Sequence, residues 1–423
     1  MLAFVLFSVF FILLLLSVPI SIALGFSSMI AIMFCTTDSV GVLIQNSFAN
    51  GFSLMAIPFF ILAGNIMARG GVSQRLVNLA NCGFGRYLGG LAHVATAACT
   101  FFGAISGSAP ATTAAIGGVM VEPMTEKGYS KAFSGACVAA SGMIGLLIPP
   151  SIIMIIYGVL TGTSVAKLFI GGIIPGLLTA AAYMICNHFI AKKLKCPRGD
   201  KPMPGETWKC TKEAIWAILM PLIILGGIYG GIFTPTESAV VAVVYGIIVG
   251  FWIHRSLTVK DLYNVFLATA KSSAIIMFLI ATAHCFSFVL ASGHIPQTLA
   301  IAIRSISQNP TLVLFLICFC LLIVGTFLDN AVAVVLMTPI FFPVVQSLGI
   351  DPIFFGVLTV FTLAIGQITP PVGLCLFVAC NLAKLKLEEI VVYCVPYIVA
   401  ALLLMCLFVF FPQIILVLPD MMN

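Results

Sequence analysis

Charged residues are scarce in this chain. Only 8% of its 423 residues are Asp, Glu, Lys or Arg, whereas 61% are hydrophobic and the mean hydropathy is +1.22. An ordinary soluble domain carries about 25% charged residues. So little charge excludes a water-exposed globule, a nucleic-acid-binding protein and a disordered chain. The composition therefore predicts a protein that is solvated mainly by lipid.

Motifs for metal, nucleotide and hydrolytic chemistry are also missing. The 14 cysteines form no CxxC pair and lack a His spacing suited to a metal, so we interpret them as small buried apolar residues. No glycine-rich loop ends in Lys-Ser or Lys-Thr, so ATP hydrolysis is not expected. Ser106 and Ser141 lie outside any GxSG motif and have no His placed to activate them, which disfavours an intramembrane hydrolase. No enzymatic activity is predicted.

Apolar runs of roughly 20 residues predict membrane-spanning helices. They cover 2–24, 27–46, 52–68, 131–160, 167–190, 213–233, 236–254, 271–291, 353–383 and 389–418. Two longer runs, 89–122 and 311–348, break midway at small or polar residues. We expect each to be a re-entrant helical hairpin that enters and leaves the membrane on one side. The more polar segments 72–88 and 294–309 are expected to lie at the interface.

The placement of the basic residues predicts the orientation of the chain. If the chain crosses the membrane at these spans, 17 of the 19 Lys and Arg residues lie on one side of the membrane, and only Lys167 and Arg304 lie on the other. Because basic loops favour the cytoplasm, the N- and C-termini are predicted to be periplasmic. The basic linker 191–212 is predicted to be cytoplasmic.

Glycines and prolines recur at a nearly constant offset. The matches, 220 to 222 residues apart, are Gly71/Gly293, Gly103/Gly325, Pro123/Pro343, Gly128/Gly349, Gly145/Gly366, Pro149-Pro150/Pro370-Pro371 and Pro175/Pro396. We therefore predict an all-α polytopic membrane protein made of two repeats, 1–190 and 213–423. Each would have five spanning helices and one hairpin, and this odd number makes the second repeat inverted. Inverted repeats with broken helices are typical of secondary transporters.

The predicted binding sites lie where the backbone of each repeat departs from helical conformation. In the first repeat the hairpin 89–122 turns at 102–110 and the helix 131–160 breaks at 145–151. In the second, 311–348 turns at 325–330 and 353–383 breaks at 366–371. Tandem prolines force unwinding, which mid-membrane backbone tolerates only when it is protein-buried or lines a wet cavity. Exposed carbonyls then suit a small hard cation, and exposed amides suit an anion.

These breaks predict two sodium sites, one in each repeat. The candidate ligands are Ser106, Ser108, Gly145, Ile148 and Pro149 in the first repeat and Gly325, Thr326, Asp329, Gly366 and Thr369 in the second. Asp329 is the only carboxylate at a hairpin tip; the alternative is that it merely caps the helix over 331–347. No Arg lies inside a predicted span, so anion recognition is expected to depend on hairpin amides and hydroxyls.

Four motifs resemble the large membrane subunit of tripartite ATP-independent periplasmic (TRAP) transporters. They are FGAISGSAPATTAAIG, IPPS, GTFLDNAVAVVLMTP and GQITPPVG, and the resemblance extends along essentially the whole chain. It implies an elevator-type transporter of the ion-transporter group, in the bacterial inner membrane. A sodium gradient would drive uptake of an organic acid, of the C4-dicarboxylate or sialic acid class. Sodium would be the coupling ion, with no other cofactor.

The resemblance also implies two partners and a substrate site. The partners are a small four-helix membrane subunit (Q), as a separate chain, and a periplasmic substrate-binding protein (P). The substrate would lie between the two hairpin tips. The residues implied to bind it are Ser106, Gly107, Ser108, Ala109, Ser151, Asp329 and Asn330.

The expected mechanism is a mobile unit of hairpins and broken helices that moves past a scaffold of the remaining helices. Sodium would order the hairpin tips and complete the anion site. Two alternatives stay open from the sequence. One is a sodium–citrate or dicarboxylate symporter of similar architecture that works without a binding protein. The other is a purely structural membrane subunit.

Overall fold

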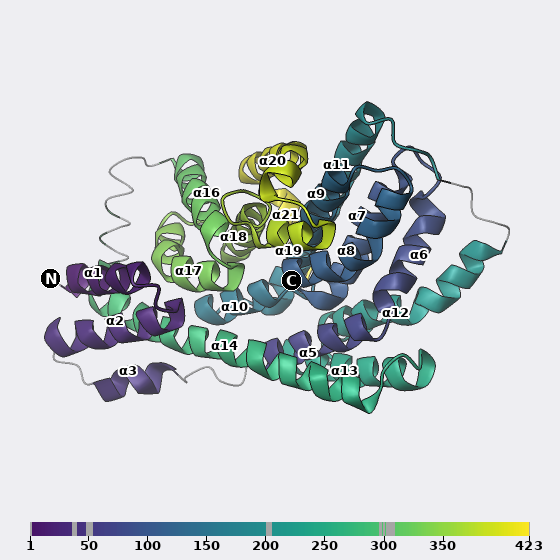
Figure 1. The fold of residues 1–423 in the computed structure, drawn as a ribbon. Helices are drawn as coiled ribbons and strands as arrows, with labels where there is room; N and C mark the ends of the chain where they lie inside the picture. The colour runs from purple at the N-terminus through teal and green to yellow at the C-terminus, as the bar shows by residue number, and fades with distance from the viewer. Residues whose placement is uncertain are drawn as a thin grey trace.

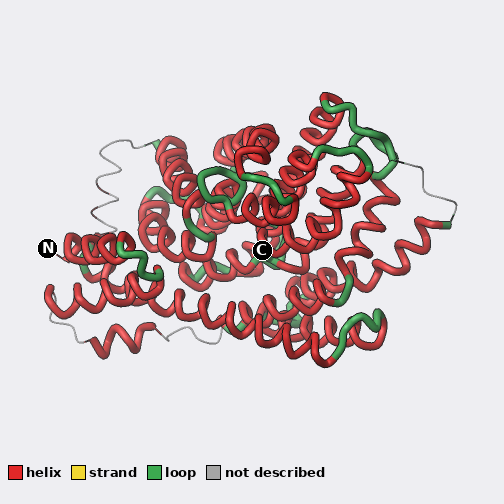
Figure 2. Tube along the Cα trace, viewed as in Figure 1, coloured by secondary structure: helices red, strands yellow, loops and turns green. Residues whose placement is uncertain are grey.

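The computed structural model describes residues 2–35, 40–47, 54–199, 205–295, 298, 301 and 309–422. Within these ranges the regular structure is helical, apart from an isolated bridge between Leu88 and Arg198 (Figure 2). The predicted all-α class is therefore confirmed.

The helices of the first half run from α1 to α11. Their bounds are α1 Leu2–Leu15, α2 Ile20–Cys35, α3 Val40–Ser47, α5 Ala56–Arg69, α6 Val72–Phe84, α7 Gly90–Ser106, α8 Ala109–Glu126, α9 Lys131–Gly142, the 3-10 turn η1 Met143–Leu146, α10 Ile152–Thr161 and α11 Val165–Lys193. The second half contains α12 Glu206–Tyr229, α13 Pro235–Ile248, the π-helical η2 Val249–Ile253, α14 Val259–Ser292, α16 Pro310–Phe327, α17 Asn330–Ser347, α18 Pro352–Gly366, α19 Leu374–Ala383, α20 Leu387–Phe410 and α21 Gln413–Asp420.

Seven of these helices are long and apolar enough to cross a membrane. They are α11, α12, α13 with η2, α14, α16, α17 and α20. The pair α5 and α6 passes the same test together but bends by 69° between its members, and it makes an eighth span if the pair is counted as one. The chain is therefore a multi-pass membrane protein.

The first predicted span, 2–24, is wrong. Helix α1 ends at Leu15, and Ser17 adopts a positive φ of 60°. Pro19 has no amide hydrogen to continue a helix, so the chain turns and α2 starts at Ile20. The two helices pack against each other as a short hairpin. The predicted 27–46 is accordingly divided between α2 and α3.

The last predicted span, 389–418, is also too long. Helix α20 ends at Phe410, two residues before Pro412, and α21 is a separate short helix that packs on α11. The predicted interfacial segment 72–88 corresponds to α6, bent away from α5. Its counterpart at 294–309 lies largely outside the described residues.

The helices form two groups (Figure 1). A peripheral layer consists of α1, α2, α3, α5, α12, α13 and α14, and the 34-residue α14 runs along it in contact with α2, α3 and α5. A central body consists of α7 to α11 and α16 to α21. Helix α6 links them, because it packs on both α7 and α12.

The two halves of the chain interlock in the central body. Helix α19 packs on α8 and α9, α20 packs on α9, and α10 packs on α17. The Tyr157 hydroxyl donates a hydrogen bond of 2.9 Å to the carbonyl of Pro352. We expected every helix outside the hairpins and the broken helices to belong to the scaffold. Instead, α11 contacts α7, and α20 contacts α9 and α18.

A buried polar network ties this body together around Asn187. Its Nδ2 donates to the Ala92 carbonyl at 3.0 Å and to Thr96 Oγ1 at 2.9 Å. The hydroxyl of Tyr397 donates to Asn187 Oδ1, and Thr96 Oγ1 lies 2.8 Å from Ser141 Oγ. The network therefore joins α7, α9, α11 and α20 through satisfied polar groups.

Replacing Asn187 by Ala should destabilise the protein. The change leaves several buried donors and acceptors without a partner, which costs about 1–3 kcal/mol in the free energy of unfolding. Thermal unfolding of the purified protein in detergent measures this. The control is Asn78→Ala, because the Asn78 side chain accepts only a surface hydrogen bond, from Gln74, in the part of the chain that the structure describes. Equal melting temperatures for the two variants would contradict the prediction.

Candidate functional site

The tip of the first hairpin is a two-residue turn between α7 and α8. Gly107 has φ +61°, which favours glycine, and the extended Ser108 is the N-cap of α8, whose second residue is Pro110. A Cβ atom on Gly107 would lie 2.6 Å from the carbonyl oxygen of Pro150. The amide of Ile152 donates to the Gly107 carbonyl at 3.3 Å. The tip therefore rests directly on the break of the first broken helix.

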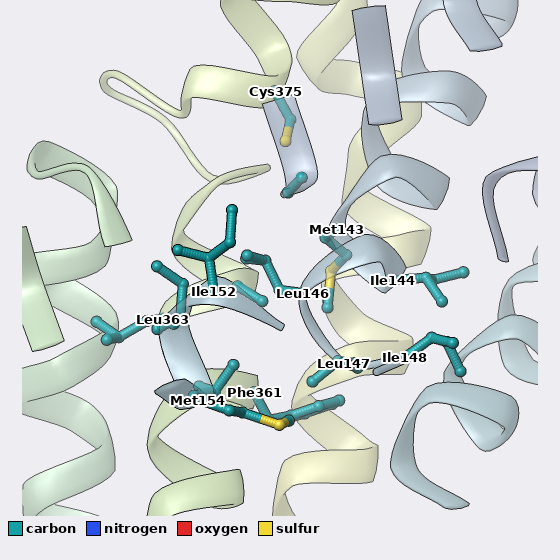
Figure 3. Packing of buried hydrophobic residues seen from close by; sticks show 14 of the residues in the cluster. Met143, Ile144, Leu146, Leu147, Ile148, Ile152, Met154, Phe361, Leu363 and Cys375 are labelled. Carbon is teal, nitrogen blue, oxygen red and sulfur yellow. The ribbon is translucent and has the colours of Figure 1, made fainter. Parts of the chain in front are cut away.

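That break lies at residues 147–151, between η1 and α10. Residue 149 is a proline, so the carbonyl of Gly145 loses its usual helical donor. The break is fully surrounded by protein: Leu147 and Ile148 are buried, and Phe361 and Leu363 of α18 lie beside it (Figure 3). Unwound backbone is thus protected from lipid, as its membrane location requires.

Oxygen atoms gather between this tip and this break. Ser106 Oγ lies 2.7 Å from Thr112 Oγ1 and donates to the Ser108 carbonyl at 3.3 Å. Gly145 faces the same atoms, because a Cβ there would collide with Thr112 Oγ1 and lie 3.2 Å from the Ser108 oxygen. Hydroxyl and carbonyl oxygens are the ligands that small hard cations prefer. The sequence analysis did not name Thr112 as a candidate ligand, although it follows Ser108 by one helical turn.

The second tip, at Leu328 and Asp329, carries the carboxylate. Asp329 Oδ1 accepts a 2.9 Å hydrogen bond from the amide of Ala331, so the residue does cap α17. Its side chain remains exposed at the surface of the tip. Cys375, at the start of α19, lies beside Thr113 of the first hairpin and near Asp329. The second tip is therefore close to the second arm of the first hairpin.

Three carbonyl oxygens converge at the second break, residues 367–373. The amide of Gly373 donates to the Thr326 carbonyl at 3.3 Å. A Cβ on Gly373 would lie 3.0 Å from the Gln367 oxygen and 3.1 Å from the Thr369 oxygen. The hydroxyls of Thr326 and Thr369 each bond a carbonyl of their own helix at 2.7 Å. Each hydroxyl uses its proton in this way, and its oxygen keeps lone pairs for a cation, as the backbone carbonyls do.

Gln367 is a candidate site residue that the sequence analysis did not name. Its side chain is 1% exposed, and Nε2 donates to Asn330 Oδ1 at 3.0 Å. Its Oε1 has no hydrogen-bond partner among the described residues. A buried acceptor without a partner costs free energy unless a ligand satisfies it. Its position inside the GQITPP motif was the available signal.

Paired glycines hold each hairpin against its broken helix. A Cβ on Gly103 would lie 2.7 Å from Cα of Gly145. A Cβ on Gly366 would collide with the backbone of Gly325. Both contacts join the first arm of a hairpin to the helix just before its break, so each half of the chain builds the same backbone-to-backbone approach.

Several predicted ligands are placed where their side chains cannot reach a ligand. Ser151 is fully buried, and its Oγ accepts from the Met154 amide at 3.4 Å, which caps α10. Ala109 and Pro149 are buried, and the side chain of Ile148 packs against Gly176. Only backbone atoms could contribute at these positions.

A cavity of about 760 Å³ separates the first hairpin from the peripheral layer. Its lining comprises Ile61, Gly64, Asn65, Ala68 and Arg69 of α5, Ser272 and Ile276 of α14, and Phe102, Ser106, Ser108, Ala111, Ala114, Ala115 and Ile152 of the central body. A second cavity of about 440 Å³ shares Asn65, Ala68, Arg69 and Ala115 with it. Arg69, which directly follows the predicted span 52–68, thus lines both cavities. No residue of the second tip lines either cavity.

Residues 7–414 match the family model described as the DctM component of tripartite ATP-independent periplasmic transporters. The isethionate TRAP transporter permease protein DctMQ of Oleidesulfovibrio alaskensis is 41% identical over 97% of this chain, which spans 65% of that protein's length. The C4-dicarboxylate TRAP transporter large permease protein DctM of Pseudomonas aeruginosa is 39% identical over 94% of both chains.

The fold also resembles a solved structure. The YdaH transporter of Alcanivorax borkumensis superposes with a TM-score of 0.68 at 14% sequence identity, over 90% of this chain and 91% of that one. At this identity the likeness shows the fold alone.

Proposed function

The chain belongs to the family of the DctM component of tripartite ATP-independent periplasmic transporters, and we propose that it imports a small organic acid anion by sodium-coupled secondary transport. Its relatives are named as transporter permeases, so its function is transport rather than enzymatic catalysis. The bacterial inner membrane is the proposed location.

The proposed substrates are small acid anions of the C4-dicarboxylate class. One relative reported above is named for C4-dicarboxylates and the other for isethionate, a sulfonate. Both ligands are small and anionic. Sialic acid, which the sequence also allowed, gains no support from these names, and it serves below as a comparison substrate.

Sodium coupling rests on one observation: each half of the chain docks a hairpin tip on a helix break lined by oxygen atoms. Ser106, Thr112 and the Ser108 carbonyl supply the oxygens in the first half. The Thr326, Gln367 and Thr369 carbonyls supply them in the second. Sodium at these places would join tip to break, and substrate binding would reciprocally tighten sodium.

We propose an elevator mechanism between two inverted repeats. The central body would move with the bound anion, and the peripheral layer would act as the scaffold. The positive-inside rule supports a cytoplasmic position for the Arg69 end of α5. Because both cavities include Arg69, they would open to the cytoplasm in the conformation that the structure shows.

The proposed partners are a small four-helix membrane subunit and a periplasmic binding protein. The family name describes a tripartite system, of which this chain is one component. The second candidate is a symporter that works without a binding protein.

Uptake into proteoliposomes containing the two membrane subunits tests this function. Radiolabelled succinate, isethionate and N-acetylneuraminate are added with the purified binding protein, with and without an inward sodium gradient. We expect one of these anions to accumulate only with both the gradient and the binding protein. Accumulation that ignores sodium would overturn the coupling. Accumulation without the binding protein would favour the symporter.

A further inference from the structure

One basic side chain lines both cavities. Arg69, in the last turn of α5, is the only charged side chain among the residues that line either of them. The remaining lining is apolar or carries uncharged polar groups. Any small anion that passes through these cavities therefore meets a single cationic group.

The guanidinium of Arg69 is not used to hold the fold. Within the described ranges it makes no hydrogen bond or ion pair with another side chain, and its side chain is exposed. Its charge acts on Asp261, but the Asp261 carboxylate is committed to Thr258, accepting from the Thr258 amide at 3.1 Å and hydroxyl at 2.6 Å. By contrast, Arg75 donates to the Gly71 carbonyl at 2.8 Å and fixes the bend between α5 and α6.

Polar groups stand beside Arg69 on the same wall. Asn65 lies one helical turn before it, and its Nδ2 donates to Thr269 Oγ1 of α14 at 3.0 Å. Ser272, one turn beyond Thr269, lines the larger cavity. This wall thus combines a fixed amide, a hydroxyl and a guanidinium on two neighbouring helices.

The facing wall leaves room for a ligand. It is formed by small residues of α8, including Ala111, Ala114 and Ala115. A Cβ on Gly118, further along the same helix, would meet nothing within 4 Å. The space between the walls extends from Ser106 and Ser108 at the tip to Arg69.

We propose that Arg69, assisted by Asn65 and Ser272, forms an anion subsite on the peripheral layer for a carboxylate or sulfonate group of the substrate. This proposal rests on the proposed function and extends it, because the subsite lies on the peripheral layer, the proposed scaffold, and not on the hairpin tips. A guanidinium binds a carboxylate through two parallel hydrogen bonds, which a lysine ammonium cannot reproduce. The subsite receives the anion as it leaves the tip for the cytoplasmic opening.

The test compares Arg69→Gln and Arg69→Lys with wild type in the reconstituted complex. The probe is whichever of succinate, isethionate and N-acetylneuraminate the wild type transports, presented from the cytoplasmic face in counterflow. We expect Arg69→Gln to raise the KM on this face by about 10- to 100-fold, because a hydrogen bond to a charged group is lost. The maximal rate should change much less. Arg69→Lys should recover only part of the affinity.

Lys271→Gln is the matched control, because Lys271 precedes Ser272 on α14 but lines neither cavity. An unchanged KM in Arg69→Gln overturns the subsite and leaves the proposed function standing. The subsite is also overturned if Arg69→Gln only lowers the amount of protein in the membrane, because Arg69 would then serve to anchor the helix. If wild type transports none of the three anions, the proposed function fails and the subsite fails with it.

Discussion

Asp329→Asn should reduce sodium-driven uptake at least about 100-fold while the protein still folds. Asn caps a helix about as well as Asp, so the 2.9 Å bond to the Ala331 amide is retained and only the charge is lost. A charge-assisted contact worth about 3 kcal/mol corresponds to roughly a hundredfold change. Uptake in proteoliposomes and the sodium dependence of its rate provide the measurement.

Asp351→Asn is the control for this prediction. Asp351 caps α18 by accepting from the amides of Ile353 at 2.7 Å and Phe354 at 3.0 Å, and it lies on the surface. This variant should transport normally. Normal uptake by Asp329→Asn as well would mean that Asp329 only caps α17, which was the alternative that the sequence left open.

The second large effect is expected from Gly366→Ala. Its new Cβ would overlap the backbone of Gly325, which cannot move aside as a flexible side chain could. Inserting atoms into a packed site costs about 1–3 kcal/mol even when neighbours adjust. We therefore expect the second hairpin to separate from its broken helix, with loss of uptake and a lower melting temperature.

Gly226→Ala in α12 provides the comparison. A Cβ there would meet nothing within 4 Å, so the variant should be neutral or stabilised by about 1 kcal/mol through its better helix propensity. Wild-type uptake by Gly366→Ala would show that the close approach of the two glycines is not required for transport.

The hairpin tips and helix breaks were predictable because their causes are local. A glycine at positive φ, such as Gly107, and a proline without an amide, such as Pro149, determine backbone geometry wherever they occur. Pro19 also indicated the turn between α1 and α2. The prediction missed this turn because the continuous hydropathy of residues 2–24 favoured a single span. The candidate cation sites could be located for the same reason.

The contacts between distant helices could not be predicted. Arg69 directly follows the predicted span 52–68, and only the arrangement of α5 opposite α8 places it in a cavity. The hydrogen bond between Asn187 and Tyr397 joins residues 210 positions apart. Backbone carbonyls that are candidate ligands, such as that of Gln367, leave no trace in the side-chain sequence.

Motion of the central body past the peripheral layer is the central claim, and a reversible cross-link tests it most directly. Ala68 of α5 and Ala115 of α8 line both cavities from opposite walls. Both would be changed to Cys in a background from which the 14 native cysteines have been removed, and bridged with mercuric ion. The control pair, Gly135→Cys with Ala383→Cys, joins α9 to α19 within the central body, where a Cβ on residue 135 would lie 3.5 Å from that of Ala383.

We expect the cross-link between residues 68 and 115 to abolish uptake, and dithiothreitol to restore it. The control cross-link should leave uptake unchanged. Uptake at the uncross-linked rate with residues 68 and 115 joined would contradict the account.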